Sequence, residues 1–398
     1  MDITIYPKKL HGTLRVIPSK SQAHRLLICA AFSDAPTFLH CPETNQDIEA
    51  TAECLRSLGA MIQRTDTGYA IEPALQIPAQ TVLNCCESGS TLRFMLPIVG
   101  ALGIDATFQM AGRLPKRPLS PLWEEMERMG CVLSRPTDST IRCSGRLTPG
   151  AYTIDGSVSS QFITGLLYAM ALMPGSSKLR VTGKTESRPY IEMTQRALAA
   201  FGVNTDNYEV SGSRPFTTPG SLTVEGDWSN GAFFLAANKL GSDLEIIGLS
   251  PDSPQGDRAA AQILADLEQN ITVDAADIPD LVPILAVTAG ARKGATFTNI
   301  ARLRLKESDR VASVAAMLQQ LGAQVRIGEN SLTVLPAKYH GCRVDAAGDH
   351  RIAMAAAIAA TAADGPVTIS GAECVKKSYP SFWEEYSRLG GSYEQYIR

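Results

Sequence analysis

The chain has 398 residues, of which 44% are hydrophobic and 19% are charged, a globular composition long enough for two or three domains. Its net charge of −3 argues against a general basic surface for nucleic acid. No charge-free apolar run reaches the roughly 18 residues that a membrane span needs, so we expect no membrane partner.

The cysteines and the first residues indicate the compartment. The nine cysteines form no CxxC pair and have no histidine at a zinc spacing, so we expect no metal site. Their odd number and irregular placement suit reduced thiols, most of them in the core. The start, MDITIYPKK, is strand-like and lacks the apolar stretch of a signal peptide. We therefore expect a cytoplasmic protein.

Two kinds of helix alternate along the chain. The first kind ends with the pattern apolar-x-x-apolar-Gly before a strand, and its glycine suits a left-handed residue that stops a helix. The pattern lies at 55–62, 126–133, 198–205, 318–325 and 386–393, with a degenerate copy at 264–271 in which Glu268 replaces the glycine. We expect an amphipathic helix to end at each copy.

The second kind of helix is apolar on nearly every face, which is typical of a helix buried on all sides. Its copies are SQAHRLLICAAF, STLRFMLPIVGAL, SQFITGLLYAMAL, SNGAFFLAANKL, DLVPILAVTAG and HRIAMAAAIAATAA, anchored at Ser21, Ser90, Ser160, Ser229, Asp280 and His350. Most anchors lie about 70 residues apart, which favours a sixfold repeat over chance recurrence of common helix and turn signals.

The repeats predict the domain organisation. Each repeat is interpreted as an α/β module, and we expect three modules to close into one globular domain. The first domain is expected over residues 13–225 and the second over residues 1–12 and 226–398. The crossover is placed near VEGD (224–227), between the third and fourth repeats.

The buried helices begin with polar clusters. These are PSKS, ESGS, SVSS, DWSN, DIPD and GDHR, and N-capping by Ser and Asp explains any single one of them. Together they present free N–H groups and the positive ends of helix dipoles, which bind anions. Lys20, Arg25, Arg93 and Arg351 lie beside these starts. A site for substrates rich in phosphate and carboxylate is therefore predicted.

Four further segments carry clustered charge. They are GRLPKRPLSPL (112–122), ESRPYIEMT (186–194), RLRLKESDR (302–310) and VKKSYP (375–380). Each alone is compatible with an ordinary solvated face. Arginine recognises phosphate and carboxylate with two hydrogen bonds, whereas lysine acts as a point charge, so the segments together fit the predicted anion site.

Nine motifs occur in the order found in one known family. They are PSKSQAHR, ESGSTLRF, LPKRPLSPL, SSQFITGLL, SRPYIEMT, IPD, RLKESDR, GDHRIAMA and KKSYPSF. With them, the chain resembles the 5-enolpyruvylshikimate-3-phosphate synthase (3-phosphoshikimate 1-carboxyvinyltransferase) family over its whole length. The resemblance implies an α/β fold of two globular domains, each an inside-out barrel of three βαβαββ-like units, with the active site in the cleft between them.

The resemblance also implies an activity. It is the transfer of the enolpyruvyl group from phosphoenolpyruvate to the 5-hydroxyl of shikimate 3-phosphate, in the shikimate pathway of aromatic amino acid and chorismate biosynthesis. No cofactor or metal is implied, and we expect a monomer. Glyphosate is implied as a ligand of the phosphoenolpyruvate pocket. The ESGST segment around Gly89 differs from the NAGT form of other members and leaves the sensitivity to glyphosate open.

Residues at matching positions are implied to bind the substrates. Those for shikimate 3-phosphate are Lys20, Ser21, Arg25, Ser159, Ser160, Gln161, Ser187, Tyr190, Asp280 and Lys306. Those for phosphoenolpyruvate are Lys20, Gly89, Arg117, Gln161, Arg310, Arg351 and Lys377. Arg93 is similar to a structural arginine of the family. Arg302 stands where some members have an asparagine, which leaves its contact with the shikimate phosphate open.

The chemistry needs a base at the hydroxyl and an acid/base at the methylene carbon. We favour Asp280 for the hydroxyl and Glu307 for the carbon, with Lys20 sharing in proton transfer, largely from the resemblance. A capping role for Asp280 and a surface ion pair for Glu307 are the plain alternatives. His350 is interpreted as a structural residue.

Two other functions stay open on the sequence. A UDP-N-acetylglucosamine enolpyruvyl transferase would share the fold and the phosphoenolpyruvate chemistry, but that family carries a cysteine in the loop that is AGRLPKR here. A non-catalytic RNA- or nucleotide-binding relative would share the repeat, but the chain lacks a basic-aromatic stripe.

Overall fold

The buried helices are the framework of the fold. In a computed structural model, which describes residues 1–212 and 215–396, six helices consist mostly of buried residues. They are α1 (Lys20–Ala31), α3 (Gly89–Leu102), α5 (Ser160–Leu172), α7 (Trp228–Lys239), α9 (Val282–Gly290) and α11 (His350–Ala360). The prediction of six buried helices is confirmed.

A second helix follows each buried one. These helices are α2 (Gln46–Ser57), α4 (Leu122–Arg128), α6 (Arg188–Ala200), α8 (Ala260–Asp266), α10 (Arg310–Gln320) and α12 (Phe382–Arg388). The glycines that were predicted to end five of them have positive φ, for example +102° at Gly59. The sixfold alternation is therefore confirmed. Short 3-10 helices join the elements: η1 (Leu114–Lys116), η2 (Asp206–Tyr208), η3 (Gly256–Ala259), η4 (Ala301–Leu305) and η5 (Ala372–Lys377).

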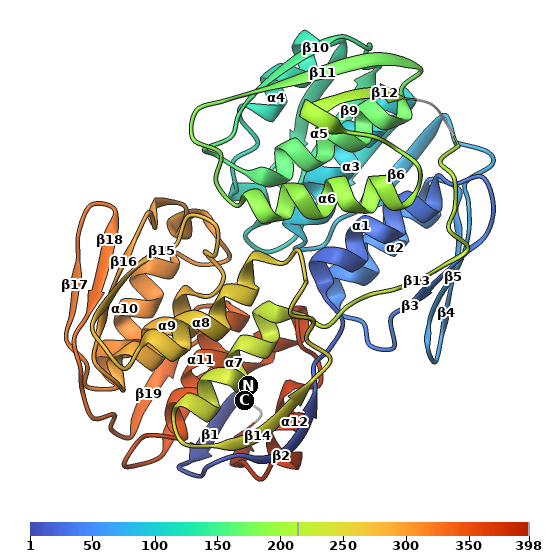
Figure 1. The fold of residues 1–398 in the computed structure, drawn as a ribbon. Helices are drawn as coiled ribbons and strands as arrows, with labels where there is room; N and C mark the ends of the chain where they lie inside the picture. Colours follow the sequence, from blue (N-terminus) through green and yellow to red (C-terminus); the bar gives the residue numbers. More distant parts are fainter. Residues whose placement is uncertain (213–214, 397–398) are drawn as a thin grey trace. The chain divides into compact units, whose positions relative to one another are not determined.

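The chain divides into two compact units (Figure 1). The first unit is Pro18–Val224, and the second is Met1–Ile17 together with Glu225–Arg398. The first boundary lies a few residues beyond the expected one, so residues 13–17 belong to the second unit and not to the first. The physical reason is strand pairing: β2 (His11–Arg15) pairs in parallel with β14 (Asp243–Ile247).

Three sheets belong to the first unit. Their strand orders are β13 (Ser221–Thr223), β3 (Thr37–His40), β5 (Gly68–Glu72), β4 (Met61–Thr65); then β6 (Gln80–Asn84), β7 (Asp105–Gln109), β9 (Thr140–Gly145), β8 (Cys131–Thr137); then β10 (Ala151–Asp155), β11 (Gly175–Thr182), β12 (Glu209–Gly212). Each sheet holds one parallel pair and is otherwise antiparallel. The sheets thus repeat one pattern, as repeated modules require.

Three further sheets belong to the second unit. Their orders are β19 (Cys342–Asp345), β20 (Val367–Ser370), β1 (Asp2–Tyr6), β21 (Ser392–Tyr396); then β15 (Ile271–Asp274), β16 (Ala295–Thr298), β18 (Ser331–Val334), β17 (Val325–Ile327); and the pair β14–β2. The same mixture of one parallel pair with antiparallel neighbours recurs in the two larger sheets. The N-terminal strands β1 and β2 therefore complete sheets built from the C-terminal half.

Each unit has its own hydrophobic core. In the first unit, α1, α3 and α5 supply many of the core side chains, and in the second, α7, α9 and α11 do. Helices α3 and α5 pack closely, and the close approach of Gly165 to the carbonyl of Arg93 leaves no room for a side chain there. Burial of these helices on all faces leaves mainly their ends to present polar groups.

Candidate functional site

Side chains cap five of the six buried helices. Ser19, Ser88 and Ser159 accept hydrogen bonds from first-turn N–H groups of α1, α3 and α5. Asp227 and Asp349 do so for α7 and α11, whereas α9 has no side-chain cap. Each capping residue therefore lies one or two positions before the residue that marks the start of its repeat in the sequence. Asp280, for which capping was the plain alternative, does not cap α9.

In the first unit, two guanidinium groups lie against Gly89, the first residue of α3. A methyl group built on Gly89 would lie 2.5 Å from Nη1 of Arg117 and 2.6 Å from Nη1 of Arg93. Nε of Arg117 is buried and has no hydrogen-bond partner within the described residues. Arg117 follows η1, whose backbone turn fixes the position of its N–H group. A cationic group close to the N-terminus of a buried helix is suited to an anion.

Arg93 joins α3 to α5. Its Nη1 donates to the Gly89 carbonyl and to Oε1 of Gln161, both at 3.3 Å, and its Nη2 donates to the Pro118 carbonyl at 3.0 Å. Nε2 of Gln161 donates to Oγ of Ser90 at 2.9 Å. Arg93 therefore fixes the positions of Gly89 and Gln161.

Arg25, buried in α1, holds residues of α6. Its Nε donates to Oγ1 of Thr194 at 2.8 Å, its Nη2 to the Tyr190 carbonyl at 2.9 Å, and its Nη1 to the Ser21 carbonyl at 2.6 Å. Its guanidinium also lies 5.2 Å from the centre of the Phe94 ring, a cation–π distance. Arg25 thus brings Ser21 and Tyr190 together, although they are far apart in the sequence.

The remaining predicted residues of this unit stand at helix starts. Ser159 and Ser160 open α5, and Ser187 precedes α6 with a left-handed φ of +54° and a buried side chain. Lys20 opens α1, and its Nζ lies 2.9 Å from Oδ2 of Asp47 on α2. Sequence reasoning singled out the lysine and missed its carboxylate partner.

In the second unit, Asp280 lies among three cations. Its carboxylate accepts a hydrogen bond from Nη1 of Arg310 at 2.6 Å and from Nη2 of Arg351 at 3.1 Å, and Nζ of Lys306 is 3.4 Å away. Its side chain keeps 19% of its surface exposed. Burial acts to raise the pKa of Asp280, but Arg351, Lys306 and Arg310 together hold that pKa well below its usual value. Asp280 is therefore ionised at neutral pH in the absence of substrate.

Arg310 is the centre of this cluster. It is 1% exposed and pairs with three carboxylates: Asp280, Glu307 at 2.7 Å and Asp349 at 2.7 Å. Glu307 is therefore not a simple surface ion pair. Asp349 is fully buried, caps α11 and also accepts a hydrogen bond from Oγ of Ser308. Sequence reasoning did not select Asp349, although the GDHR motif contained it.

Lys306 has an unusual acidity for a lysine. Burial lowers its pKa, the negative charge of Asp280 acts in the opposite direction, and the positive charges of Arg310 and Arg302 add to the lowering, so that the pKa of Lys306 is about 8. The neutral amine is consequently accessible near physiological pH. Two other predicted residues are also placed in this unit: Lys377 is buried at the end of η5, and His350 is buried at the start of α11.

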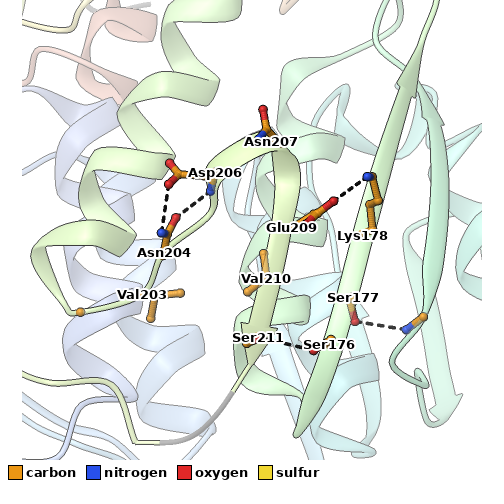
Figure 2. A pocket seen from close by; sticks show the side chains of 12 residues that line it. Ser176, Ser177, Lys178, Val203, Asn204, Asp206, Asn207, Glu209, Val210 and Ser211 are labelled. Atoms are coloured by element: carbon orange, nitrogen blue, oxygen red, sulfur yellow. Dashed lines mark hydrogen bonds and ion pairs between the residues drawn. The ribbon is translucent and has the colours of Figure 1, made fainter.

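A surface hollow of about 670 Å³ lies elsewhere in the first unit (Figure 2). Its walls come from β11, β12 and the segment after α6, and none of the predicted site residues lines it. Its charged pair Lys178–Glu209 is joined at 2.5 Å, and Asn204 donates to Asp206 at 3.0 Å. The polar groups of the hollow thus bond mainly to one another.

Within residues 1–212 and 215–396, no group of three or more His, Cys, Asp or Glu side chains is arranged to hold a metal ion. Over the same residues, no helix has both the length and the apolar composition to cross a membrane. The charges that face Asp280 are supplied by arginine and lysine side chains.

Comparison with known proteins places this fold in the class of enolpyruvyl transferases. The sequence model of EPSP synthase (3-phosphoshikimate 1-carboxyvinyltransferase) matches residues 5–386, and the chain belongs to this family.

Relatives of full length support the assignment. A 3-phosphoshikimate 1-carboxyvinyltransferase of Clostridium kluyveri is 37% identical and covers 99% of this chain and 98% of its own. That of Clostridioides difficile is 35% identical, with coverages of 99% and 98%.

Solved structures share the fold. EPSP synthase from Acinetobacter baumannii has a TM-score of 0.81 at 22% identity, covering 99% of this chain and 100% of its own. The enolpyruvyl transferase NikO from Streptomyces tendae has a TM-score of 0.77 at 18% identity, with coverages of 99% and 98%. The predicted fold class, an α/β enolpyruvyl transferase fold, is confirmed.

Proposed function

We propose that the protein transfers the enolpyruvyl group of phosphoenolpyruvate to the 5-hydroxyl of shikimate 3-phosphate. The reaction adds the hydroxyl oxygen to C2 of phosphoenolpyruvate while C3 gains a proton. The tetrahedral adduct then loses inorganic phosphate as C3 gives up a proton. The products are 5-enolpyruvylshikimate 3-phosphate and phosphate. Membership of the family supports this reaction.

The observation that carries the proposal is the carboxylate of Asp280 among Arg310, Arg351 and Lys306. A carboxylate with so low a pKa is a weak base while those cations surround it. Phosphoenolpyruvate is an anion and competes with the Asp280 carboxylate for Arg310 and Arg351. When Arg310 and Arg351 turn to phosphoenolpyruvate, as proposed, the pKa of Asp280 rises and the carboxylate becomes a better acceptor for the hydroxyl proton.

The other proton transfers are assigned by position. Glu307, hydrogen-bonded to Arg310 at 2.7 Å, is proposed to exchange the proton at C3. Lys20, at the start of α1 in the first unit, is also proposed to take part in proton transfer. Lys306, whose pKa is about 8, is able to bind an anion as a cation or to accept a proton at neutral pH.

Substrate binding is proposed for the two residue sets. In the first unit, the residues held by Arg25 and the N-termini of α1, α5 and α6 are suited to shikimate 3-phosphate. The Arg117 guanidinium beside Gly89 is suited to phosphoenolpyruvate, together with Arg310, Arg351 and Lys377 of the second unit. That the two sets act in one cleft between the units stays a prediction, as do the monomeric state and the cytoplasmic location.

The activity is tested by phosphate release. With both substrates present, we expect inorganic phosphate and 5-enolpyruvylshikimate 3-phosphate to appear in equal amounts, and no release when either substrate is omitted. A colorimetric phosphate assay and mass spectrometry of the product measure this.

The same assay separates the alternatives. Release with UDP-N-acetylglucosamine in place of shikimate 3-phosphate would assign the protein to the other transferase reaction. No release with either acceptor would support a non-catalytic relative.

Gly89→Ala tests the proposed phosphoenolpyruvate contact. Its methyl group would meet Nη1 of Arg117 at 2.5 Å, about 1 Å inside normal contact, so the guanidinium must move. Misplacing a binding group by this distance costs up to about 100-fold, so we expect kcat/KM for phosphoenolpyruvate to fall about 10- to 100-fold. Steady-state kinetics measures it.

The second substrate provides the control for this variant. The KM for shikimate 3-phosphate is expected to change less, because among its proposed contacts only Gln161 is linked to Gly89, through Arg93. An unchanged kcat/KM for phosphoenolpyruvate would remove Arg117 from that pocket.

A further inference from the structure

A second carboxyl group, Asp257, is buried in the unit that holds Asp280. Asp257 lies in η3 and is 2% exposed. Its Oδ2 accepts a hydrogen bond from Oγ of Ser229, whereas its Oδ1 is buried and has no hydrogen-bond partner in the described part of the chain. An ionised carboxylate in this position is costly, because burial removes its hydration and only one hydrogen bond replaces it.

The segment around Asp257 is fixed against the start of α7. Oε1 of Gln255 accepts a hydrogen bond from the Trp228 N–H at 3.0 Å, and its Nε2 donates to the Gly226 carbonyl at 2.8 Å. The helices that meet here, α7, α8, α9 and α11, are grouped in the second unit (Figure 1). Asp257 therefore cannot easily turn towards solvent.

The charges that act on Asp257 come from three elements. Asp227 caps α7, Asp280 precedes α9, and Arg351 lies in the first turn of α11, while Ser229 of α7 donates the single hydrogen bond. Arg351 already donates to the carboxylate and to the backbone carbonyl of Asp280. Asp257 and Asp280 thus share the influence of one guanidinium, and Asp227 adds a further negative charge beside Asp257. The balance of charge favours a proton on the most buried of them.

The pKa of Asp257 is raised, as this arrangement of charges requires. Burial raises its pKa, the negative charge of Asp280 raises it further, and Arg351 and the Ser229 hydroxyl lower it, which leaves the pKa of Asp257 at about 7. Asp257 is therefore neutral below pH 7 and ionised above it, in contrast to Asp280.

We propose that Asp257 is a positioning residue for the transfer reaction, whose proton keeps Arg351 available to Asp280 and to the anionic substrate. When Asp257 loses this proton, its new negative charge attracts the Arg351 guanidinium and opposes the approach of phosphoenolpyruvate. The inference rests on the proposed function and adds a regulatory group to its site. It predicts weaker binding of phosphoenolpyruvate as the pH rises through about 7.

The test compares Asp257→Asn with the wild-type protein between about pH 6 and pH 8.5. Taking the ratio of the two KM values at each pH cancels the ionisation of phosphoenolpyruvate itself. We expect the ratio of wild-type to variant KM for phosphoenolpyruvate to rise about tenfold across this range, since a coupling of one pKa unit is a factor of ten in affinity. Asp252→Asn, an exposed neighbour, is the matched control, and its ratio should stay constant.

Ser229→Ala keeps the carboxyl group and removes its hydrogen-bond donor. The loss of the donor raises the pKa of Asp257, so the rise in KM is expected to move to higher pH. If Asp257→Asn does not fold, the pH profile of Ser229→Ala tests the inference in its place. A purely structural role would change stability without moving the pH profile.

Stability gives a readout independent of turnover. A carboxyl group whose pKa is raised by folding binds more protons in the folded state, so its contribution to stability is fully present below about pH 4 and is lost as the pH rises through about 7. The unfolding free energy of the wild type relative to Asp257→Asn is therefore expected to fall between these values. The inference would be overturned if the ratio of wild-type to Asp257→Asn KM stayed constant over the pH range of the kinetic comparison and the pH profile of Ser229→Ala did not move. No phosphate release by the wild type would instead overturn the proposed function.

Discussion

Replacement of Asp280 by Asn is expected to lower kcat by about 10²- to 10⁴-fold, the usual contribution of one general acid or base. The amide has the size of the carboxylate and keeps one acceptor oxygen for Arg310, while Arg351 loses its bond to Oδ2 but keeps its bond to the Asp280 carbonyl. It cannot accept the hydroxyl proton. The rate of phosphate release at saturating substrate measures the effect, and binding of shikimate 3-phosphate alone, measured by calorimetry, should change far less.

The control for this variant lies three residues earlier. Asp277 is exposed, and Asp277→Asn is expected to leave kcat at the wild-type value. Glu307→Gln is expected to lose most of its turnover for a different reason, since it blocks the proton exchange at C3. Near-normal turnover in either Asp280→Asn or Glu307→Gln would remove that residue from the proposed mechanism.

Replacement of Arg310 by Met is expected to lower the unfolding free energy of the second unit by about 3–5 kcal/mol and to abolish turnover. The variant leaves Asp349 buried without this cation and removes one hydrogen-bond donor each from Asp280 and Glu307. Urea unfolding followed by tryptophan fluorescence measures it. Trp228 and Trp383 report mainly on the second unit, and Trp123 reports on the first.

Two variants control for this effect. Arg304 pairs with Asp309 at 3.2 Å with both side chains 40% exposed, so Arg304→Met should cost less than about 1 kcal/mol. Arg310→Met combined with Asp349→Asn removes the unpaired charge and keeps a capping side chain on α11, so part of the stability should return while turnover stays lost. A stable, active Arg310→Met would contradict the central position of Arg310.

The sequence predicted the helices because their pattern is local. Buried helices need apolar residues on every face, and the glycine that ends an amphipathic helix needs a positive φ, so both features are visible over a dozen residues. The repeat then gave the number of modules. The domain boundary was placed too early because the pairing of β2 with β14 joins residues more than 200 positions apart.

The partners within the site could not be predicted in the same way. Lys20 and Arg310 are conspicuous as cations, but their carboxylate partners Asp47 and Asp349 come from other elements and are recognised only when the chain is folded. The same holds for Asp257, whose acidity results from its burial beside Asp280. A capping role and a catalytic role for Asp280 were equally compatible with the sequence; the structure shows that Asp280 does not cap α9, and its catalytic role stays a prediction.

The participation of the N-terminal strand in a C-terminal sheet has a consequence for biosynthesis. Strand β1 pairs with both β20 and β21, with Asp2 opposite Tyr396. During translation, the first unit is continuous in the chain and is able to fold soon after Val224 leaves the ribosome. The apolar β1, with Ile3 and Ile5 fully buried in the final fold, must wait without partners until β20 and β21 emerge. An unpaired hydrophobic strand is prone to intermolecular pairing, so newly made chains are most vulnerable to aggregation while the second half is being synthesised.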